Sequence, residues 1–296
     1  MLDLPKYPVK TRELHNHHFD STIWNDFAFR DDDIVIATYA KSGTTWVQQI
    51  VAQLIFDGAE GLPVAEMSPW LDLRVPPKAV KLPLVEAQTH RRFLKTHLPV
   101  DVLAQGEVRL HRPRRAGRDV VQPSRQRQRL VVRSPERNAG ARRRSDRSAP
   151  RLGRCAYFRD WLARDGYPFW PFWENVRSWW AIRDLPNVHL VHFQRLKDDM
   201  PGEIRRIAAF LEIPVDEARW EAILEHCSFA YMKANATASV PLGGAFWDGG
   251  AETFVHKGTN GRWRGMLSAE DSAAYERRAI AELGPEAAAW LLTGSR

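Results

Sequence analysis

Short apolar runs alternate along the chain with stretches whose apolar residues recur at helical spacing. Residues 34–38 are such a run, rich in β-branched side chains, and predict a buried strand. Residues 92–96 and 188–193 predict two further short strands. A helix is predicted from about Thr44 to Phe56, because apolar residues recur there every three or four positions: Val47, Ile50, Val51, Leu54 and Ile55.

Four later stretches predict helices, and several carry signals for a helix N-terminus. The stretch 201–211 has Pro201 at its start, a residue type that favours the first turn of a helix. The stretch 216–226 opens with Asp216, a residue type that favours the N-cap. Ser268 and Asp271 form a pair like a capping box at the start of the last one. The Trp-rich stretch Trp170–Trp180 is expected to be core rather than ligand pocket. The four predicted helices are 171–183, 201–211, 216–226 and 268–282.

Strands that alternate with helices indicate a parallel sheet covered on both faces. Pro-rich residues 60–90 and Gly-rich residues 234–262 predict loops. The chain has 296 residues, of which 44% are hydrophobic, enough for a sizeable core. We therefore expect a single α/β domain over residues 1–296, with a central parallel sheet flanked by helices.

Composition excludes several classes of protein. No apolar run is long enough to span a bilayer, and none at the N-terminus resembles a signal peptide. Two cysteines, Cys155 and Cys227, fit a reducing compartment and supply neither a disulfide framework nor a metal cluster. These features predict a cytoplasmic protein with no membrane partner and no metal.

Positive charge is concentrated in one segment. Residues 109–154 hold 16 Arg, no Lys and three acids, so they carry +13, whereas the chain as a whole carries +7. The segment lacks aromatic residues, which argues against binding of single-stranded nucleic acid. Two interpretations remain open. The segment is a genuine basic insert, or it is read in a shifted frame, since a composition rich in Arg and free of Lys and aromatic residues is what a GC-rich gene gives out of frame.

The clearest chemical signal lies between the first predicted strand and helix. Residues 41–46 read KSGTTW. A loop at this position gathers unpaired backbone N–H groups at a helix N-terminus, which attracts anions. Lys41 adds a full positive charge, and the hydroxyls of Ser42, Thr44 and Thr45 add donors. The pattern predicts a phosphate site.

This motif and three later segments resemble the cytosolic sulfotransferases, in the same order and at similar spacing, and we expect a bacterial member of that family. The later segments are KTHLP at 95–99, the strand and loop VHFQRLKD at 191–198 preceded by Trp179 and Trp180, and HKGTNGRWR at 256–264. The resemblance implies a fold related to P-loop kinases. It also implies transfer of a sulfuryl group from 3′-phosphoadenosine-5′-phosphosulfate (PAPS) to a hydroxyl or amine, which leaves 3′,5′-adenosine bisphosphate.

The resemblance assigns catalytic roles to three residues. Lys41 would stabilise charge on the leaving phosphate. His97 would be the general base, and an imidazole titrates near pH ~6.5, within reach of neutral pH. Lys95 would help to stabilise the transferring group, and the alternative is an ordinary surface lysine on a strand.

The resemblance also assigns residues to the nucleotide. Those expected at the 5′-phosphate are Lys41, Ser42, Gly43, Thr44 and Thr45. Those expected at the adenine are Trp46 and Phe229, with core packing as the alternative for each. Those expected at the 3′-phosphate are Arg115, Ser124, His256, Lys257 and Gly258. His256 stands where the family has arginine, and Ser124 lies one residue later than the family spacing from Arg115.

The middle segment departs most from the family. The resemblance implies an apolar strand that ends in an arginine, for which Arg115 is the candidate. Residues 109–114 are instead rich in Arg and Pro, which disfavours a buried central strand. Three other functions therefore stay open: a catalytically impaired nucleotide-binding relative, a P-loop kinase, or a nucleic-acid module built on the Arg tract. The preferred reading has a small-molecule acceptor (a phenol, alcohol or amine) and no nucleic-acid partner.

Overall fold

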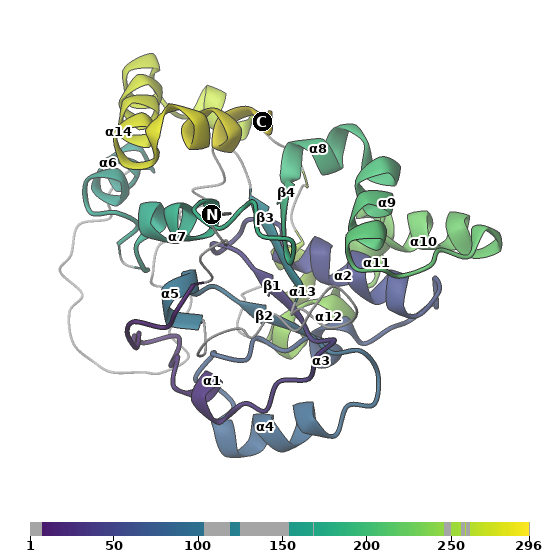
Figure 1. Cartoon of the computed structure of the whole chain (residues 1–296). Coiled ribbons are helices and arrows are strands. Elements are labelled where there is room, and N and C mark those ends of the chain that lie inside the picture. Colours follow the sequence, from purple (N-terminus) through teal and green to yellow (C-terminus); the bar gives the residue numbers. More distant parts are fainter. Residues whose placement is uncertain are drawn as a thin grey trace, which may run out of the picture.

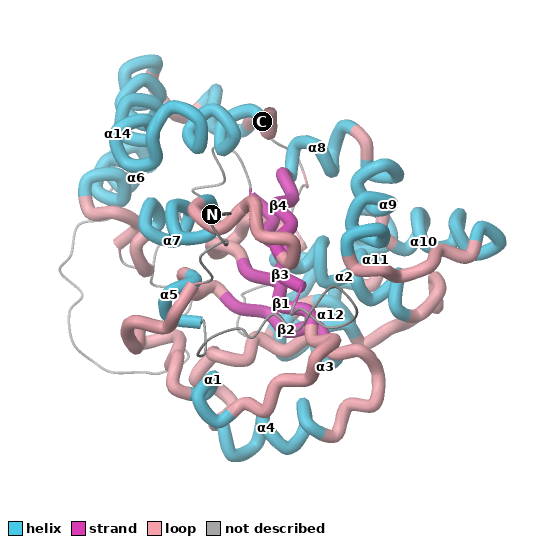
Figure 2. Tube along the Cα trace, in the orientation of Figure 1, coloured by secondary structure: helices cyan, strands magenta, loops and turns pink. Residues whose placement is uncertain are grey.

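A four-stranded parallel sheet forms the centre of the molecule (Figures 1 and 2). The computed structural model describes residues 8–103, 119–124 (backbone), 154–167, 169–245, 250–255, 258 and 261–295. The strands lie in the order β2-β1-β3-β4 and every neighbouring pair is parallel. Their bounds are β1 Ile34–Ala37, β2 Phe93–Thr96, β3 Asp119–Ser124 and β4 Val188–His192. The predicted α/β fold with a central parallel sheet is confirmed.

Helices cover both faces of this sheet. The helices of the described residues are α1 Ile23–Asp26, α2 Thr44–Ile55, α3 Val64–Met67, α4 Lys78–Glu86, α5 Val100–Leu103, α6 Arg154–Ala163, α7 Phe172–Trp180, α8 Phe193–Asp198, α9 Met200–Phe210, η2 Glu217–Arg219, α10 Trp220–His226, α11 Phe229–Ala234, α12 Ala236–Ser239, η3 Pro241–Gly244, α13 Gly250–Phe254, η4 Arg262–Gly265 and α14 Ala269–Thr293. The three predicted strands and the helix after the first strand agree with the structure to within one residue at each end.

Three predicted loops contain helices. Residues 60–90 include α3 and α4, residues 193–198 form α8, and residues 234–262 include α12, η3 and α13. In α4 the prolines were misleading, because Pro77 stands just before the helix, where its missing N–H costs nothing, and Pro83 is on the exposed side. The last helix runs past its predicted end, to Thr293, and bends at Gly284, whose φ of 77° is non-helical.

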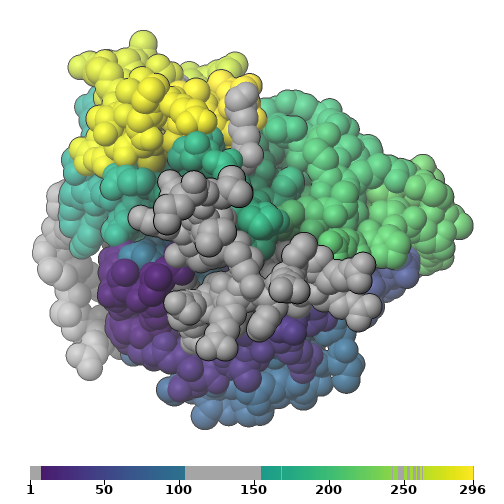
Figure 3. Space-filling view, in the orientation of Figure 1, coloured from purple at the N-terminus to yellow at the C-terminus, as the bar shows by residue number. Residues whose placement is uncertain are grey.

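The two faces of the sheet are buried against different helices. Ile34 and Ile36 pack on α2, α9 and α10, whereas Val35 and Ala37 face the opposite side, where α1 and α5 contribute. A strand that is buried on both faces reads as a continuous apolar run, as this one does. In Figure 3 the N-terminal third, in purple and blue, forms the lower part of the molecule, and α14, in yellow, lies at the top.

The central strand position next to β1 is occupied by β3. Its register places Asp119 beside Ile34 and Ser124 beside His192. In the family pattern this strand ends in the arginine for which Arg115 is the candidate, whereas β3 begins after Arg115 in the sequence. Pro123 is accommodated next to the last residue of the strand, where a missing ladder donor costs least. Residues 109–118 and 125–153 lie outside the described residues, so both interpretations of the basic segment stay predictions.

A buried ion pair joins β1 to β2 at their amino ends. Arg92 donates from Nε to Asp33 Oδ1 at 2.7 Å and from Nη2 to Asp33 Oδ2 at 2.5 Å, and both side chains are essentially inaccessible. Arg92 Nη2 also donates to the carbonyl of Ala28. A bidentate pair of this kind tolerates burial only while both partners are present.

Arg92→Met is therefore expected to lower the free energy of unfolding by about 3–5 kcal/mol, since it leaves the carboxylate of Asp33 buried without its cation. Urea denaturation measures the loss. Arg205→Met, which breaks an exposed pair with Glu217, is the matched control and should cost less than about 1 kcal/mol. A double variant, Arg92→Met with Asp33→Leu, should recover part of the loss. Equal losses of unfolding free energy in Arg92→Met and Arg205→Met would contradict this account.

Candidate active site

The loop between β1 and α2 combines strained backbone with an open helix terminus. Lys41 has a φ of 63° and Gly43 a φ of 98°, both in the left-handed region. That conformation is uncommon for a residue with a side chain, and such strain gathers at functional sites. The loop leads directly into α2 through the N-cap residue Gly43, and the first N–H groups of a helix have no partner one turn earlier within the helix. The loop therefore combines a strained backbone with a helix N-terminus, an arrangement that can attract an anion.

Side chains of the loop face in different directions. Ser42 and Thr44 are buried, and Thr44 Oγ1 lies 2.5 Å from Thr38 Oγ1 at the end of β1. Lys41 is exposed, and its Nζ lies 3.6 Å from the ring centroid of Phe254 in α13. Ser42 and Thr44 thus face the protein interior, whereas Lys41 lies at the surface of the loop.

His97 follows β2 at the same edge of the sheet, and its imidazole is 4% exposed. Its Nδ1 lies 2.7 Å from the carbonyl oxygen of Thr38. Because a carbonyl oxygen only accepts, Nδ1 carries the proton and Nε2 presents a lone pair. Burial, aided by the charges of Lys95 and Lys41, lowers the pKa of His97 well below 6.5. The side chain is neutral at pH 7, with Nε2 as its free base.

Aromatic rings enclose this imidazole. Trp170 stacks on His97 with ring centroids 5.6 Å apart, and Trp70 meets it edge-on at 4.6 Å. Trp170 is held in turn by Tyr39, whose hydroxyl donates to the Trp170 carbonyl at 2.8 Å. The expectation that the stretch Trp170–Trp180 is core is confirmed for the tryptophans of α7, whereas Trp170 also lines the site.

Helix α7 fixes the turn that carries His97. Asn175 Nδ2 donates to the His97 carbonyl at 3.0 Å, and Trp179 Nε1 donates to the Leu98 carbonyl at 3.1 Å. Ser178 Oγ accepts from the backbone N–H of Val100 at 3.1 Å. Three side chains from one face of a helix therefore hold the backbone of the KTHLP turn.

Lys95 lies inside the protein, so its interpretation as a surface lysine is wrong. It is 5% exposed, and its Nζ lies 5.0 Å from the ring centroid of Trp70. Burial lowers the pKa of Lys95 to about 8, and the nearby carboxylate of Asp72 opposes that shift. The ammonium group of Lys95 therefore lies close enough to His97 to affect its pKa, and Lys95 itself titrates near pH 8.

A second group of predicted residues meets where the start of α2 contacts the segment before α11. Trp46 is half-buried, and its Nε1 donates to the carbonyl of Cys227 at 2.8 Å. Two residues further on, Phe229 is 36% exposed. Gly258 lies against it, since a Cβ on Gly258 would come within 2.6 Å of the Phe229 ring. The structure thus brings Trp46, Phe229 and Gly258 into one neighbourhood.

Comparison with known proteins gives the identity of this arrangement. The family model described as "Sulfotransferase domain" matches residues 31–283. The chain belongs to the PAPS-dependent sulfotransferases. This confirms the predicted family and decides against the P-loop kinase.

Individual relatives agree with the family. The sulfotransferase is 28% identical to a glycolipid sulfotransferase of Mycobacterium bovis over 98% of its own length and 97% of the relative's. Mouse sulfotransferase 1B1 is 27% identical over 85% and 82%. Among solved structures, mouse sulfotransferase SULT7A1 complexed with PAP has a TM-score of 0.67 at 19% identity, with 90% of each chain covered. Retinol dehydratase in a complex with retinol and PAP has a TM-score of 0.62 at 22% identity, with 88% and 84% covered.

Other predicted site residues of the sulfotransferase are only partly described. Arg115, His256 and Lys257 lie outside the described residues, and Ser124 is described for its backbone alone, as the last residue of β3. No cluster of three metal-binding side chains occurs in the described part of the chain, and no helix there is long and apolar enough to cross a membrane.

Sequence reasoning missed several residues of the sulfotransferase site. Thr38, Trp70, Asp72 and Asn175 all touch the KTHLP turn or the rings around it. Thr38 could have been found as the last residue of the first predicted strand. The other three reach the site through loop and helix packing, which leaves no periodic pattern in the sequence.

Proposed function

We propose that this sulfotransferase moves the sulfuryl group of PAPS to a hydroxyl or amine of a small molecule, with His97 as general base. The observation that carries the proposal is the hydrogen bond from His97 Nδ1 to the Thr38 carbonyl. It leaves Nε2 as the base, beside a loop built for an anion. A base and an anion site at one sheet edge suit in-line transfer between a donor phosphate and an acceptor hydroxyl.

The loop of residues 41–45 is proposed to bind the 5′-phosphate of the donor. Backbone N–H groups at the start of α2 and the hydroxyls of Ser42 and Thr45 supply hydrogen bonds. Thr44 contributes through its N–H, since its hydroxyl already pairs with Thr38. Lys41 places its ammonium against the oxygen on which negative charge develops as the S–O bond breaks.

His97 is proposed to accept the proton of the attacking hydroxyl at Nε2. The bond from Nδ1 to Thr38 keeps the ring oriented and offsets the charge that the imidazolium then carries. Lys95 sits close enough to His97 to lower its pKa, and its ammonium would offset negative charge on the transferring group.

The nucleoside end of the donor is proposed to lie against Trp46 and Phe229, with the 3′-phosphate near Gly258. The half-exposed ring of Phe229 offers a face for stacking of a base. Arg115, Ser124, His256 and Lys257 remain proposed ligands of the 3′-phosphate on the strength of the family pattern alone.

Gly258→Ala is expected to weaken binding of 3′,5′-adenosine bisphosphate at least about tenfold, because its Cβ would overlap the Phe229 ring. Calorimetric titration measures the dissociation constant. Gly261→Ala is the matched control: Gly261 also has a positive φ, 74°, but a Cβ there would meet only Arg264, at an ordinary contact distance of 3.9 Å, so it carries the backbone strain without the overlap. Similar losses in both variants would show that strain, and not the Phe229 contact, governs binding.

The acceptor is proposed to be an aromatic or otherwise apolar molecule that bears a hydroxyl or amine. Trp70 and Trp170 contact the ring of His97, Phe169 contacts Trp170, and such rings favour apolar acceptors. We place the enzyme in the cytoplasm, because its two cysteines are unbridged thiols, as expected in a reducing compartment.

The function is tested on the purified chain with two measurements. Calorimetry with 3′,5′-adenosine bisphosphate should show binding at one site, and mass spectrometry should detect sulfated product from PAPS and a panel of phenols, alcohols and amines. Binding without transfer to any acceptor would favour the catalytically impaired relative. Absence of binding would refute the proposal.

A further inference from the structure

Asp72 is a buried carboxylate to which the reaction assigns no role. It is 1% exposed, yet three donors converge on its two oxygens. Oδ2 accepts from Trp24 Nε1 at 2.9 Å and from the Thr96 hydroxyl, and Oδ1 accepts from Trp70 Nε1. Indole N–H groups can only donate. The surroundings of Asp72 are therefore arranged for an ionised carboxylate.

Two of these donors, Thr96 and Trp70, adjoin the proposed catalytic residues Lys95 and His97. Thr96 stands between Lys95 and His97, and its Oγ1 also accepts from the backbone N–H of Leu98 at 3.1 Å. Trp70 presents its face to Lys95 at 5.0 Å and its edge to His97 at 4.6 Å. Removing the carboxylate would release both the turn and the ring that touches the catalytic groups.

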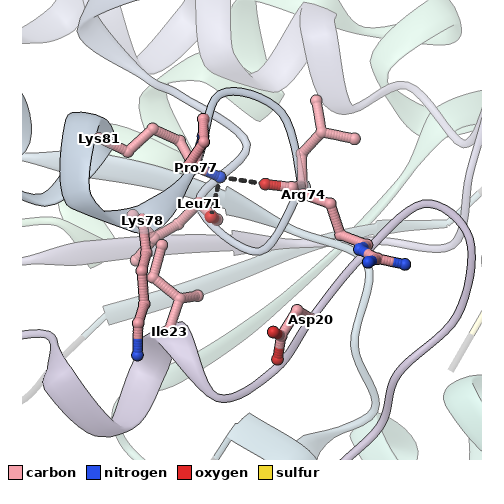
Figure 4. A pocket seen from close by; sticks show the side chains of 8 residues that line it. Asp20, Ile23, Leu71, Arg74, Pro77, Lys78 and Lys81 are labelled. Carbon is pink, nitrogen blue, oxygen red and sulfur yellow. Dashed lines mark hydrogen bonds between the residues drawn. The ribbon is translucent and has the colours of Figure 1, made fainter.

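The loop that carries Asp72 is itself fastened to β2. Leu71 N–H donates to the Lys95 carbonyl, and Lys95 N–H donates to the Pro69 carbonyl, each at 3.1 Å. Lys81, from α4, donates its buried ammonium to the carbonyls of Leu71 and Leu73, as the dashed lines in Figure 4 show beside a surface pocket. The loop therefore places Asp72 rigidly.

Asp72 also acts electrostatically on the ammonium of Lys95, which faces the same Trp70 ring whose indole N–H donates to Asp72. Among the described residues, Asp72 acts on the ammonium of Lys95, and the other titratable groups around this pair are His97, Lys41, His18 and Lys81. Asp72 is the anion among them. Burial raises the pKa of Asp72, but the three donors and the charge of Lys81 favour its ionised form. Each buried charge offsets the cost of burying the other.

We propose that Asp72 is a positioning residue for sulfuryl transfer, whose ionised carboxylate orients Trp70 and Thr96 and keeps the Lys95 ammonium protonated as its buried counter-charge. The proposal rests on the proposed function for its catalytic part. Its electrostatic part concerns the folded chain alone and can be measured without turnover.

The test follows the titration of Lys95 by NMR of its ε-carbon, assigned with Lys95→Met. The midpoint in the unaltered enzyme is expected near pH 8. Asp72→Asn removes the anion, disfavours the ammonium, and should move that midpoint down by about 1–3 pH units. The alkaline limb of kcat should move in the same direction. Asp20→Asn is the matched control. Asp20 lies beside Asp72, since its backbone N–H donates to the Asp72 carbonyl, but its carboxylate is not among the groups that shift the pKa of Lys95.

Trp70→Phe separates orientation from charge. It keeps an aromatic ring and the Asp72 carboxylate but removes the indole donor. We expect kcat to fall about tenfold, with the KM for PAPS and the Lys95 midpoint little changed. An Asp72→Asn midpoint equal to that of the unaltered enzyme would overturn the proposal, and so would a Trp70→Phe enzyme with full kcat.

A measurement on the unaltered chain covers the case in which Asp72→Asn does not fold. Carboxyl-carbon NMR should find Asp72 ionised at pH 7 to 8, and a protonated Asp72 there would also overturn the proposal. Failure of the proposed function has a different signature. The unaltered enzyme would then produce no sulfated product, whatever the midpoint of Lys95.

Discussion

His97→Asn is expected to lower kcat by about 10²–10⁴-fold, the usual contribution of a general base, while 3′,5′-adenosine bisphosphate still binds. Asparagine suits this test because its amide nitrogen can replace Nδ1 as donor to the Thr38 carbonyl. The variant therefore can keep the local hydrogen bond while it removes Nε2 and its lone pair together with the rest of the ring. Single-turnover transfer and calorimetry measure the two effects separately.

Two further variants serve as comparisons for His97→Asn. His15→Asn removes an exposed imidazole paired with Asp20 and should leave kcat unchanged. His97→Ala should be as inactive as His97→Asn but less stable, because it opens a cavity among buried rings. Transfer by His97→Asn at the rate of the unaltered enzyme would remove His97 from the mechanism.

The pH profile of kcat should carry the same signature. The pKa of His97 lies well below 6.5 in the folded chain, so Nε2 stays unprotonated as the pH falls through neutrality. Activity lost to protonation of this base should appear only well below pH 6.5. An acid limb centred at or above pH 6.5 would indicate another base.

The parts of the site that sequence reasoning identified are those in which chemistry and secondary structure are local. Lys41 and Gly43 lie between an apolar strand and an amphipathic helix, and His97 directly follows a short strand. Parallel neighbouring strands bring their carboxyl ends to one edge, so two separate motifs predict one site. The pairing of β1 with β2 is the feature of the fold that places them together.

The parts that sequence reasoning missed depend on packing across the chain. Lys95 resembles any strand lysine, and it is buried because the loop of residues 69–73 runs beside β2. Asp72 looks like one acid in a Pro-rich loop, yet its partners stand at positions 24, 70 and 96. Prolines also concealed α4, which supplies Lys81. No periodicity records contacts of this kind, because they join segments with no common pattern.

Lys41→Met is expected to weaken both binding and chemistry. Methionine keeps most of the apolar stem and removes the charge, so the dissociation constant for 3′,5′-adenosine bisphosphate should rise about tenfold or more. The rate of transfer should fall by a further 10²–10³-fold, about the loss found when one donor to a developing anion is removed. Calorimetry gives the first effect, and single-turnover kinetics at saturating PAPS gives the second.

The position of Lys41 makes this variant a clean probe of charge. Its side chain is exposed and its ammonium lies over the Phe254 ring, so its loss leaves no buried cavity and should not unfold the loop. Lys78→Met is the matched control: Lys78 is an exposed lysine paired with Asp26, and its loss should change neither measurement.

Lys41→Arg keeps the charge in a broader, planar group that fits the phosphate differently, so binding should survive better than transfer. Because the leaving oxygen gains charge only as the S–O bond breaks, a cation at this position must affect transfer more than binding. Unchanged kinetics in Lys41→Met would place the leaving group elsewhere.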